Sequence, residues 1–168
     1  MESRAEAAAD LGLASRIVGL LASRELTVAT AESLTGGLVC AALTDVPGAS
    51  AVLRGGVVAY ATELKAALLG VPASLLAERG AVDPDVAAAM ADGVRERLTA
   101  AVGVATTGVA GPDPAEGKPP GTVHVAVSSQ TGRITRTLRL VGDREQIRHD
   151  TVRRCLGLLW AVLAEEDE

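Results

Sequence analysis

The sequence predicts a single three-layer α/β domain, spanning residues 1–168, in which helices flank a mixed β-sheet. Helical and strand-like patterns alternate through most of the chain, as is typical of parallel strands joined by helices. Two successive period-two stretches, GTVHVAVSS (121–129) and RITRTLRLV (133–141), then predict an antiparallel hairpin. A chain of 168 residues can bury one core, and we find no repeat or linker that divides it.

In the first half of the chain, helices and strands alternate. Residues 5–24 predict an amphipathic helix, because apolar residues recur at three- and four-residue spacings. A strand at 26–31 leads through a polar turn into a short apolar helix. The stretch LRGGVVAYAT (53–62) predicts a second strand, in which two successive glycines mark a bulge or a close backbone approach. A helix over 63–69 should follow.

The second half begins with helices and ends with one. A short helix is expected over 72–80, and Asp83-Pro84 then supplies an N-cap and a first-turn proline for a longer helix. AVGVATTGVAG (101–111) predicts a buried strand. The segment 112–121 contains four prolines and should be a loop. After the hairpin, residues 142–166 predict a C-terminal helix.

The composition argues against several classes of partner. The net charge is −5, and the basic stripe expected of a nucleic-acid-binding protein is missing. No apolar run approaches the roughly 20 residues of a membrane helix. Cys40 and Cys155 lie far apart in apolar helical patterns, which favours buried free thiols. With no secretory layout at the N-terminus, we expect a cytoplasmic protein that binds neither membrane nor nucleic acid; its aliphatic composition is compatible with a homo-oligomer.

The stretch ESLTGG (32–37) lies between a predicted strand and a predicted helix. Unpaired N–H groups at a helix N-terminus attract anions, and glycines let a phosphate or an oxyanion approach closely. The alternative is a simple helix cap. The stretch is neither a dinucleotide fingerprint nor a P-loop, and it lacks the glycine two residues before Ser33 that a GxSxG elbow requires.

A serine nucleophile needs a base, and the rare lysines are more informative than the histidines. His124 lies within a strand and His149 in an arginine-rich helix, where structural or surface roles are expected. Of the 16 basic residues only Lys65 and Lys118 are lysines. A desolvated lysine can lose its proton near neutral pH, whereas arginine cannot. Lys65 and the single tyrosine, Tyr60, are therefore candidates for chemistry; a solvated lysine and a core aromatic are the alternatives.

A third polar cluster, TTGVAGPDPAEGKPPGT (106–122), follows a buried strand. Its first residues include Thr106, Thr107, Gly108 and Gly111. Hydroxyls and backbone donors without charge suit a ribose, a phosphate or an amide. The alternative is an ordinary glycine-rich turn followed by a surface loop.

Two arginines, Arg144 and Arg148, lie at the start of the predicted C-terminal helix. A guanidinium group can hold a phosphate through two parallel hydrogen bonds. For Arg148 an ion pair with Glu145 or Asp150 is the stronger expectation. Lys118, in the proline-rich loop, is expected to be solvated.

Six segments in this order resemble the CinA C-terminal domain family, whose enzymatic members are nicotinamide-nucleotide amidases. They are TVATAESLTGG, RGGVVAYATELK, GAVDP, TTGVAGPDP, KPPGTV and GDREQIR, and the resemblance extends over about residues 10–163. It implies hydrolysis of the carboxamide of nicotinamide mononucleotide to nicotinate mononucleotide and ammonia. The partner it implies is this small-molecule nucleotide substrate, and the reaction would use no cofactor and no metal.

The resemblance also implies roles for individual residues. Ser33 would be the nucleophile, Lys65 the base and Tyr60 a supporting phenol. Where many members carry Asn this chain has Thr62, a departure that bears on the activity or the substrate preference. A nucleotide-binding protein without catalysis and a competence-associated interaction protein stay as alternatives. The residues implied to bind substrate are Thr35, Gly36, Gly37, Thr62, Thr107, Gly108, Gly111 and Arg144.

Overall fold

A five-stranded mixed sheet forms the centre of the computed structural model, which describes the backbone of residues 2–165 and the side chains of residues 11–165. The strand order is β2-β1-β3-β4-β5. Strand β1 pairs in parallel with β2 and β3, while β3–β4 and β4–β5 are antiparallel. The strands are β1 (Val28–Glu32), β2 (Leu53–Val58), β3 (Val102–Gly108), β4 (Thr122–Ser129) and β5 (Gly132–Arg139).

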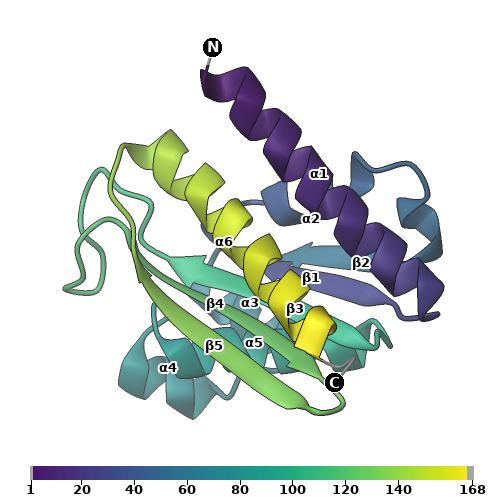
Figure 1. Ribbon diagram of the computed structural model, residues 1–168. Helices are drawn as coiled ribbons and strands as arrows, with labels where there is room; N and C mark the ends of the chain where they lie inside the picture. The colour runs from purple at the N-terminus through teal and green to yellow at the C-terminus, as the bar shows by residue number, and fades with distance from the viewer. Residues whose placement is uncertain (1, 166–168) are drawn as a thin grey trace.

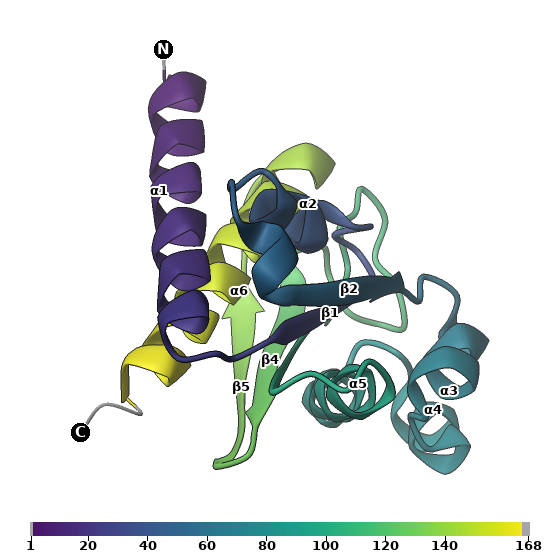
Figure 2. The same cartoon turned by 90° about the vertical axis from the view of Figure 1, so that its right-hand side faces the viewer.

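Helices cover both faces of this sheet, so the predicted three-layer α/β fold is confirmed (Figures 1 and 2). One layer contains α1 (Glu2–Ser23), α2 (Leu38–Thr44) and α6 (Arg144–Glu165). The other contains α3 (Thr62–Leu69), α4 (Ala73–Arg79) and α5 (Pro84–Arg97). The last residue of the expected C-terminal helix, Glu166, lies outside the described residues. None of the described helices combines the length and the apolar character needed to cross a membrane.

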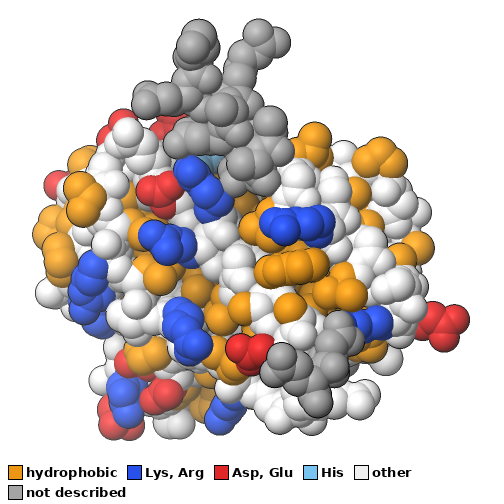
Figure 3. Space-filling view, viewed as in Figure 1, with side chains coloured by type: hydrophobic (Ala, Val, Ile, Leu, Met, Phe, Trp, Pro, Cys, Tyr) orange, Lys and Arg blue, Asp and Glu red, His pale blue; other side chains and the backbone are white. Residues whose placement is uncertain are grey.

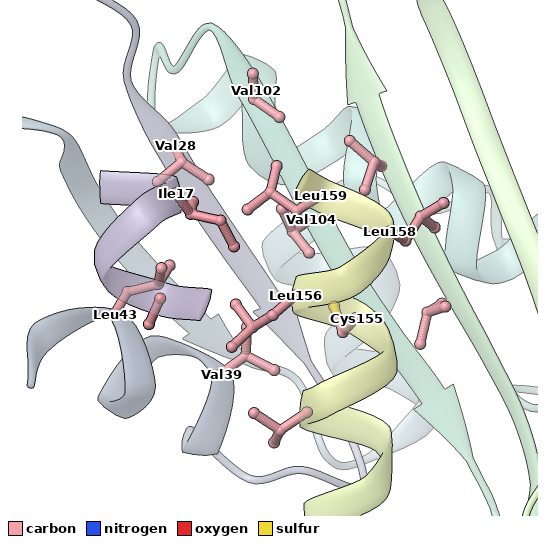
Figure 4. Packing of buried hydrophobic residues seen from close by; sticks show 14 of the residues in the cluster. Ile17, Val28, Val39, Leu43, Val102, Val104, Cys155, Leu156, Leu158 and Leu159 are labelled. Carbon is pink, nitrogen blue, oxygen red and sulfur yellow. The ribbon is translucent and has the colours of Figure 1, made fainter. Parts of the chain in front are cut away.

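The two faces of the sheet differ in side-chain size. Val28, Val102 and Val104 lie toward α1 and α6, where Leu156 and Leu159 pack against them (Figure 4). The opposite face carries small residues, which lets α5 approach the sheet closely. At Gly103 an added Cβ would lie 2.1 Å from the carbonyl oxygen of Ala91 in α5. The residues of the small-residue face that belong to the second core cluster are Ala29, Ala31, Ala105 and Ala126.

Several local predictions are confirmed. The register between β1 and β2 shifts where Val28 pairs with Leu53 and the next residue pairs with Gly55, which is the expected irregularity. The side chain of Asp83 accepts a hydrogen bond from the Asp85 N–H at 2.8 Å and caps α5, with proline at the first turn. Ser129 pairs with Gly132 to close the predicted hairpin.

Two strands are shorter than predicted. The strand expected over 53–62 ends at Val58, and the one expected over 101–111 ends at Gly108. For β2 the reason is the short partner strand, because β1 ends at Glu32, which pairs with Val58. Strand β3 runs two residues past its last pairing with β1, at Thr106, and ends where Gly108 pairs with Val123 near the start of β4. Beyond Val58 only one further bond, from the Ala59 N–H to the Glu32 carbonyl at 2.9 Å, continues the ladder. The released segment turns into α3 and carries Tyr60 and Lys65 with it.

Candidate functional site

The N-terminus of α2 is occupied by a side chain of the protein. Strand alternation directs Glu32 to the same face as Val28, where α2 begins. Its carboxylate is 1% exposed and accepts hydrogen bonds from the N–H groups of Gly37, Val39 and Cys40 at 3.0, 3.0 and 2.8 Å. The expectation that this helix offers unpaired donors to a phosphate or an oxyanion is therefore wrong. A carboxylate already satisfies the donors and places negative charge there.

Ser33 follows this strand, and Lys65 of α3 reaches it from the opposite layer. Lys65 Nζ lies 3.1 Å from Ser33 Oγ, 2.7 Å from the Ala59 carbonyl oxygen and 3.4 Å from that of Tyr60. The two side chains are almost fully buried, with 8% of Ser33 and 1% of Lys65 exposed. All three partners of the amine are neutral oxygens. The structure thus brings together the predicted nucleophile and the predicted base.

The surroundings of Lys65 favour its neutral form. Burial removes water from the ammonium group and lowers the pKa of Lys65 below its ordinary value of 10.5. The carboxylates of Glu116 and Glu63 act in the opposite direction, and the effect of burial is the larger. A neutral amine has two hydrogens and one lone pair. If both hydrogens are donated to the carbonyls of Ala59 and Tyr60, the lone pair of the neutral amine can accept the Ser33 hydroxyl proton, whereas the protonated amine donates to Ser33 Oγ.

Tyr60 is joined to this pair through its backbone, and its phenol is turned to another partner. The residue is 57% exposed, and its hydroxyl accepts a hydrogen bond from Arg144 Nη2 at 2.9 Å. Arg144 Nη1 also donates to the Gly111 carbonyl at 2.6 Å. Three predicted residues, Tyr60, Arg144 and Gly111, therefore form one cluster beside Lys65. A supporting role for the phenol stays a prediction.

The threonines predicted to bind substrate differ in position. The Thr35 hydroxyl is buried and lies 2.8 Å from the Thr106 hydroxyl. The Thr107 hydroxyl, also buried, donates to the Ala81 carbonyl at 2.7 Å. Both hydroxyls tie strands and turns together beneath the site. Thr62, by contrast, is exposed at the first position of α3. Substrate contacts of these residues stay predictions.

The predicted glycines have conformational reasons to be glycine. Gly36 and Gly37 have φ values of +61° and +103°, in the left-handed region, and turn the chain from β1 into α2. At Gly108 an added Cβ would lie 2.7 Å from the Thr122 carbonyl oxygen of the neighbouring strand. These requirements hold whether or not a ligand binds, so they leave the predicted ligand contacts untested.

Arg148 is the site residue whose contacts sequence reasoning missed. Its Nε donates to the Leu34 carbonyl at 2.9 Å and its Nη2 to the Thr35 carbonyl at 3.2 Å. The expected ion pair with Glu145 or Asp150 is wrong: the carboxylate of Asp150 pairs with Arg153 at 2.8 Å. The four-residue spacing of Arg144 and Arg148 was an available signal, since it places both side chains on one side of α6.

Two backbone N–H groups next to Ser33 have no hydrogen-bond acceptor among the described residues. The Ser33 N–H donates to the Thr106 carbonyl at 3.1 Å, and the Gly36 N–H donates to the Ser33 carbonyl at 3.0 Å. Among the hydrogen bonds of the described residues, none involves the N–H of Leu34 or of Thr35. In serine hydrolases with a strand–turn–helix nucleophile, the N–H of the residue after the nucleophile stabilises the oxyanion.

A surface hollow of about 650 Å³ lies elsewhere, between β5 and α6. Its lining includes Arg136, Arg154 and Leu158, and neither Ser33 nor Lys65 belongs to it. Figure 3 shows Lys and Arg side chains on this face of the molecule. Across the described residues, no group of three His, Cys, Asp or Glu side chains is arranged to hold a metal ion.

Comparison with known proteins agrees with this α/β architecture. The family model for the CinA C-terminal domain matches residues 10–163. A CinA-like protein of Frankia casuarinae is 55% identical over 156 residues, which are 93% of this chain and 36% of that protein. A CinA-like protein of Gemmatimonas aurantiaca is 45% identical over 159 residues, 94% of this chain and 37% of that protein. The chain thus spans little more than a third of these relatives' length.

Solved structures of CinA-related proteins share this fold. The competence/damage inducible protein CihA of Agrobacterium tumefaciens superposes with a TM-score of 0.87 at 40% identity, covering 90% of this chain and 94% of that chain. A CinA superfamily protein of Klebsiella pneumoniae gives a TM-score of 0.90 at 33% identity, covering 93% and 98%. The fold and site define an α/β domain with a buried serine–lysine pair at the end of a parallel strand. The chain belongs to the CinA C-terminal domain family.

Proposed function

We propose that this protein hydrolyses the carboxamide of nicotinamide mononucleotide to nicotinate mononucleotide and ammonia, through an acyl-enzyme on Ser33. The observation that carries the proposal is the 3.1 Å hydrogen bond between Lys65 Nζ and Ser33 Oγ inside a nearly dry site. Burial lowers the pKa of a lysine, and its neutral amine can then act as the general base that activates a neighbouring hydroxyl. The choice of substrate rests on the family, whose enzymatic members act on nicotinamide nucleotides.

The acylation step uses the two side chains in sequence. Ser33 Oγ attacks the carboxamide carbon while neutral Lys65 accepts the hydroxyl proton. In the tetrahedral intermediate the C–N bond then breaks. The Lys65 ammonium gives its proton to the departing amino group, which leaves as ammonia. Water attacks the carbonyl carbon of the resulting ester while Lys65 accepts a water proton. The bond between that carbon and Ser33 Oγ then breaks, the Lys65 ammonium returns its proton to Ser33 Oγ, and the acid is released.

The developing negative charge on the amide oxygen requires donors. The N–H groups of Leu34 and Thr35 follow the nucleophile directly and are open in the described structure. We assign them to this oxyanion. Loss of one such donor typically costs about 10²–10³ in rate, because its interaction is strongest in the transition state.

The nucleotide's phosphate requires a cation at the edge of the site. Arg144 is exposed, and its guanidinium already lies against the phenol of Tyr60 and the carbonyl of Gly111. A phosphate can accept two parallel hydrogen bonds from such a group. Arg144 takes this role in the proposal, and Tyr60 stands between the phosphate site and Lys65.

Variants of Lys65 test the proposal. Lys65→Ala and Lys65→Arg should both lower ammonia release from nicotinamide mononucleotide by about 10²-fold or more, because general-base catalysis contributes about 10²–10⁴-fold and a guanidinium cannot accept the proton. Lys118→Arg, at the other lysine of the chain, is the control and should match wild type. Full activity in Lys65→Arg would refute proton transfer by this side chain. Nucleotide binding by wild type without ammonia release would instead indicate a binding protein.

A further inference from the structure

One arginine of α6 binds two successive carbonyls of the turn after Ser33. Arg148 of α6 donates from Nε to the Leu34 carbonyl at 2.9 Å and from Nη2 to the Thr35 carbonyl at 3.2 Å. Two successive carbonyls are bound by one planar cation. A lysine in its place would have one point of charge and could not reproduce this fork. The contact is specific to an arginine at this position.

The bound carbonyls share their peptide groups with N–H donors. A peptide is planar, with C=O and N–H in one rigid unit, and the Leu34 carbonyl belongs to the same unit as the Thr35 N–H. A cation on the carbonyl oxygen fixes the orientation of that unit. It also draws electron density from the peptide, so the N–H becomes a stronger donor, as in any chain of hydrogen bonds that polarise one another.

We infer that Arg148 is a positioning residue of the proposed amidase: it orients and polarises the Leu34–Thr35 peptide, whose N–H stabilises the oxyanion formed when Ser33 attacks the amide carbon. The inference rests on the proposed function. Because the negative charge develops only in the transition state, the contribution of Arg148 should appear in kcat while KM changes little.

Three variants separate this role from a general effect of losing an arginine. Arg148→Gln removes the charge, Arg148→Lys keeps the charge without the fork, and Arg154→Gln is the control. Arg154 lies on the same helix, is exposed and lines the hollow beside β5, apart from Ser33. We expect Arg148→Gln to lower kcat for nicotinamide mononucleotide by about 10- to 10²-fold, less than removal of the donor itself. The KM of Arg148→Gln should stay at the wild-type value, and Arg154→Gln should have wild-type kcat and KM.

A second readout does not depend on the substrate. A fluorophosphonate probe phosphorylates an activated serine and displaces fluoride, and it also builds negative charge on an oxygen beside Ser33. Mass spectrometry of the Ser33 peptide gives its labelling rate. Arg148→Gln should slow this labelling by a factor similar to its effect on kcat, with Arg154→Gln unchanged.

The outcomes distinguish the two claims. Equal kcat and equal labelling in wild type and Arg148→Gln would overturn the inference while leaving the proposed function intact. If wild type is labelled but releases no ammonia, the proposed function fails and the labelling rates alone decide the role of Arg148. If wild type shows neither reaction, both claims fall. Should Arg148→Gln lack the native circular dichroism spectrum, Arg148→Lys is judged by the same two rates.

Discussion

At the scale of single residues, the central feature is a lysine kept in a place that disfavours its charge. Lys65 is 1% exposed, and its hydrogen-bond partners among the described residues are all neutral oxygens. Burial lowers the pKa of its amine, so folding is opposed whenever the amine must be protonated. A lysine retained despite this cost fits a catalytic role better than a structural one.

The same lowered pKa predicts a pH dependence of stability. Between the folded-state pKa of Lys65 and its ordinary value of 10.5, the unfolded chain binds more protons, so the free energy of unfolding should rise with pH. The gain from this one group is at most about 1.4 kcal/mol per pH unit. In Lys65→Met the gain should vanish. Urea denaturation at several pH values measures it, with Lys118→Met as the control.

Parallel pH profiles of wild type and Lys65→Met would contradict a lowered pKa at this position. The test compares how steeply the free energy of unfolding changes with pH in wild type and in Lys65→Met. The loss of the two hydrogen bonds to the Ala59 and Tyr60 carbonyls in the variant therefore does not affect it. That loss shifts the whole curve of Lys65→Met by a constant amount, whereas the effect of titration changes its slope.

At the scale of elements, the sheet's small-residue face decides how closely α5 packs. Gly93 of α5 meets the end of α3, where an added Cβ would lie 1.8 Å from the Leu69 carbonyl oxygen. Gly157 of α6 is also inside a helix, but an added Cβ there has nothing within 4 Å. The two glycines therefore have the same local cost and opposite surroundings. This makes them a matched pair.

Alanine at these two glycines should have opposite effects. Gly157→Ala should raise the free energy of unfolding by about 0.5–1 kcal/mol, because alanine is the better helix former. Gly93→Ala should lower it by about 1–3 kcal/mol, since the backbone must move to accommodate the methyl group. Urea denaturation of both variants tests the packing of α5 and α3. A stabilised Gly93→Ala variant would show that this packing is looser than described.

At the scale of the whole molecule, the fold and the Ser33–Lys65 pair could be predicted from the sequence, whereas contacts between distant segments could not. Hydrophobic periodicity predicts the three layers because each element must bury one face. The rarity of lysine directs attention to Lys65. The hydrogen bond from Arg148 to the Leu34 carbonyl joins residues 114 positions apart, and no local sequence pattern predicts such a contact. The sequence shows that a glutamate, Glu32, precedes α2. It does not show that the carboxylate caps the N-terminus of this helix, because that depends on the direction in which the strand presents the side chain.

Ammonia release from nicotinamide mononucleotide by wild type and by Ser33→Ala is the most direct test of the central claim. Ser50→Ala is the control, since Ser50 is exposed in the short 3₁₀ helix Ala49–Ala51. We expect wild type and Ser50→Ala to release ammonia at the same rate and Ser33→Ala to release none, while all three fold. Release by Ser33→Ala at the wild-type rate, or no release by wild type, would contradict a serine amidase built on Ser33 and Lys65.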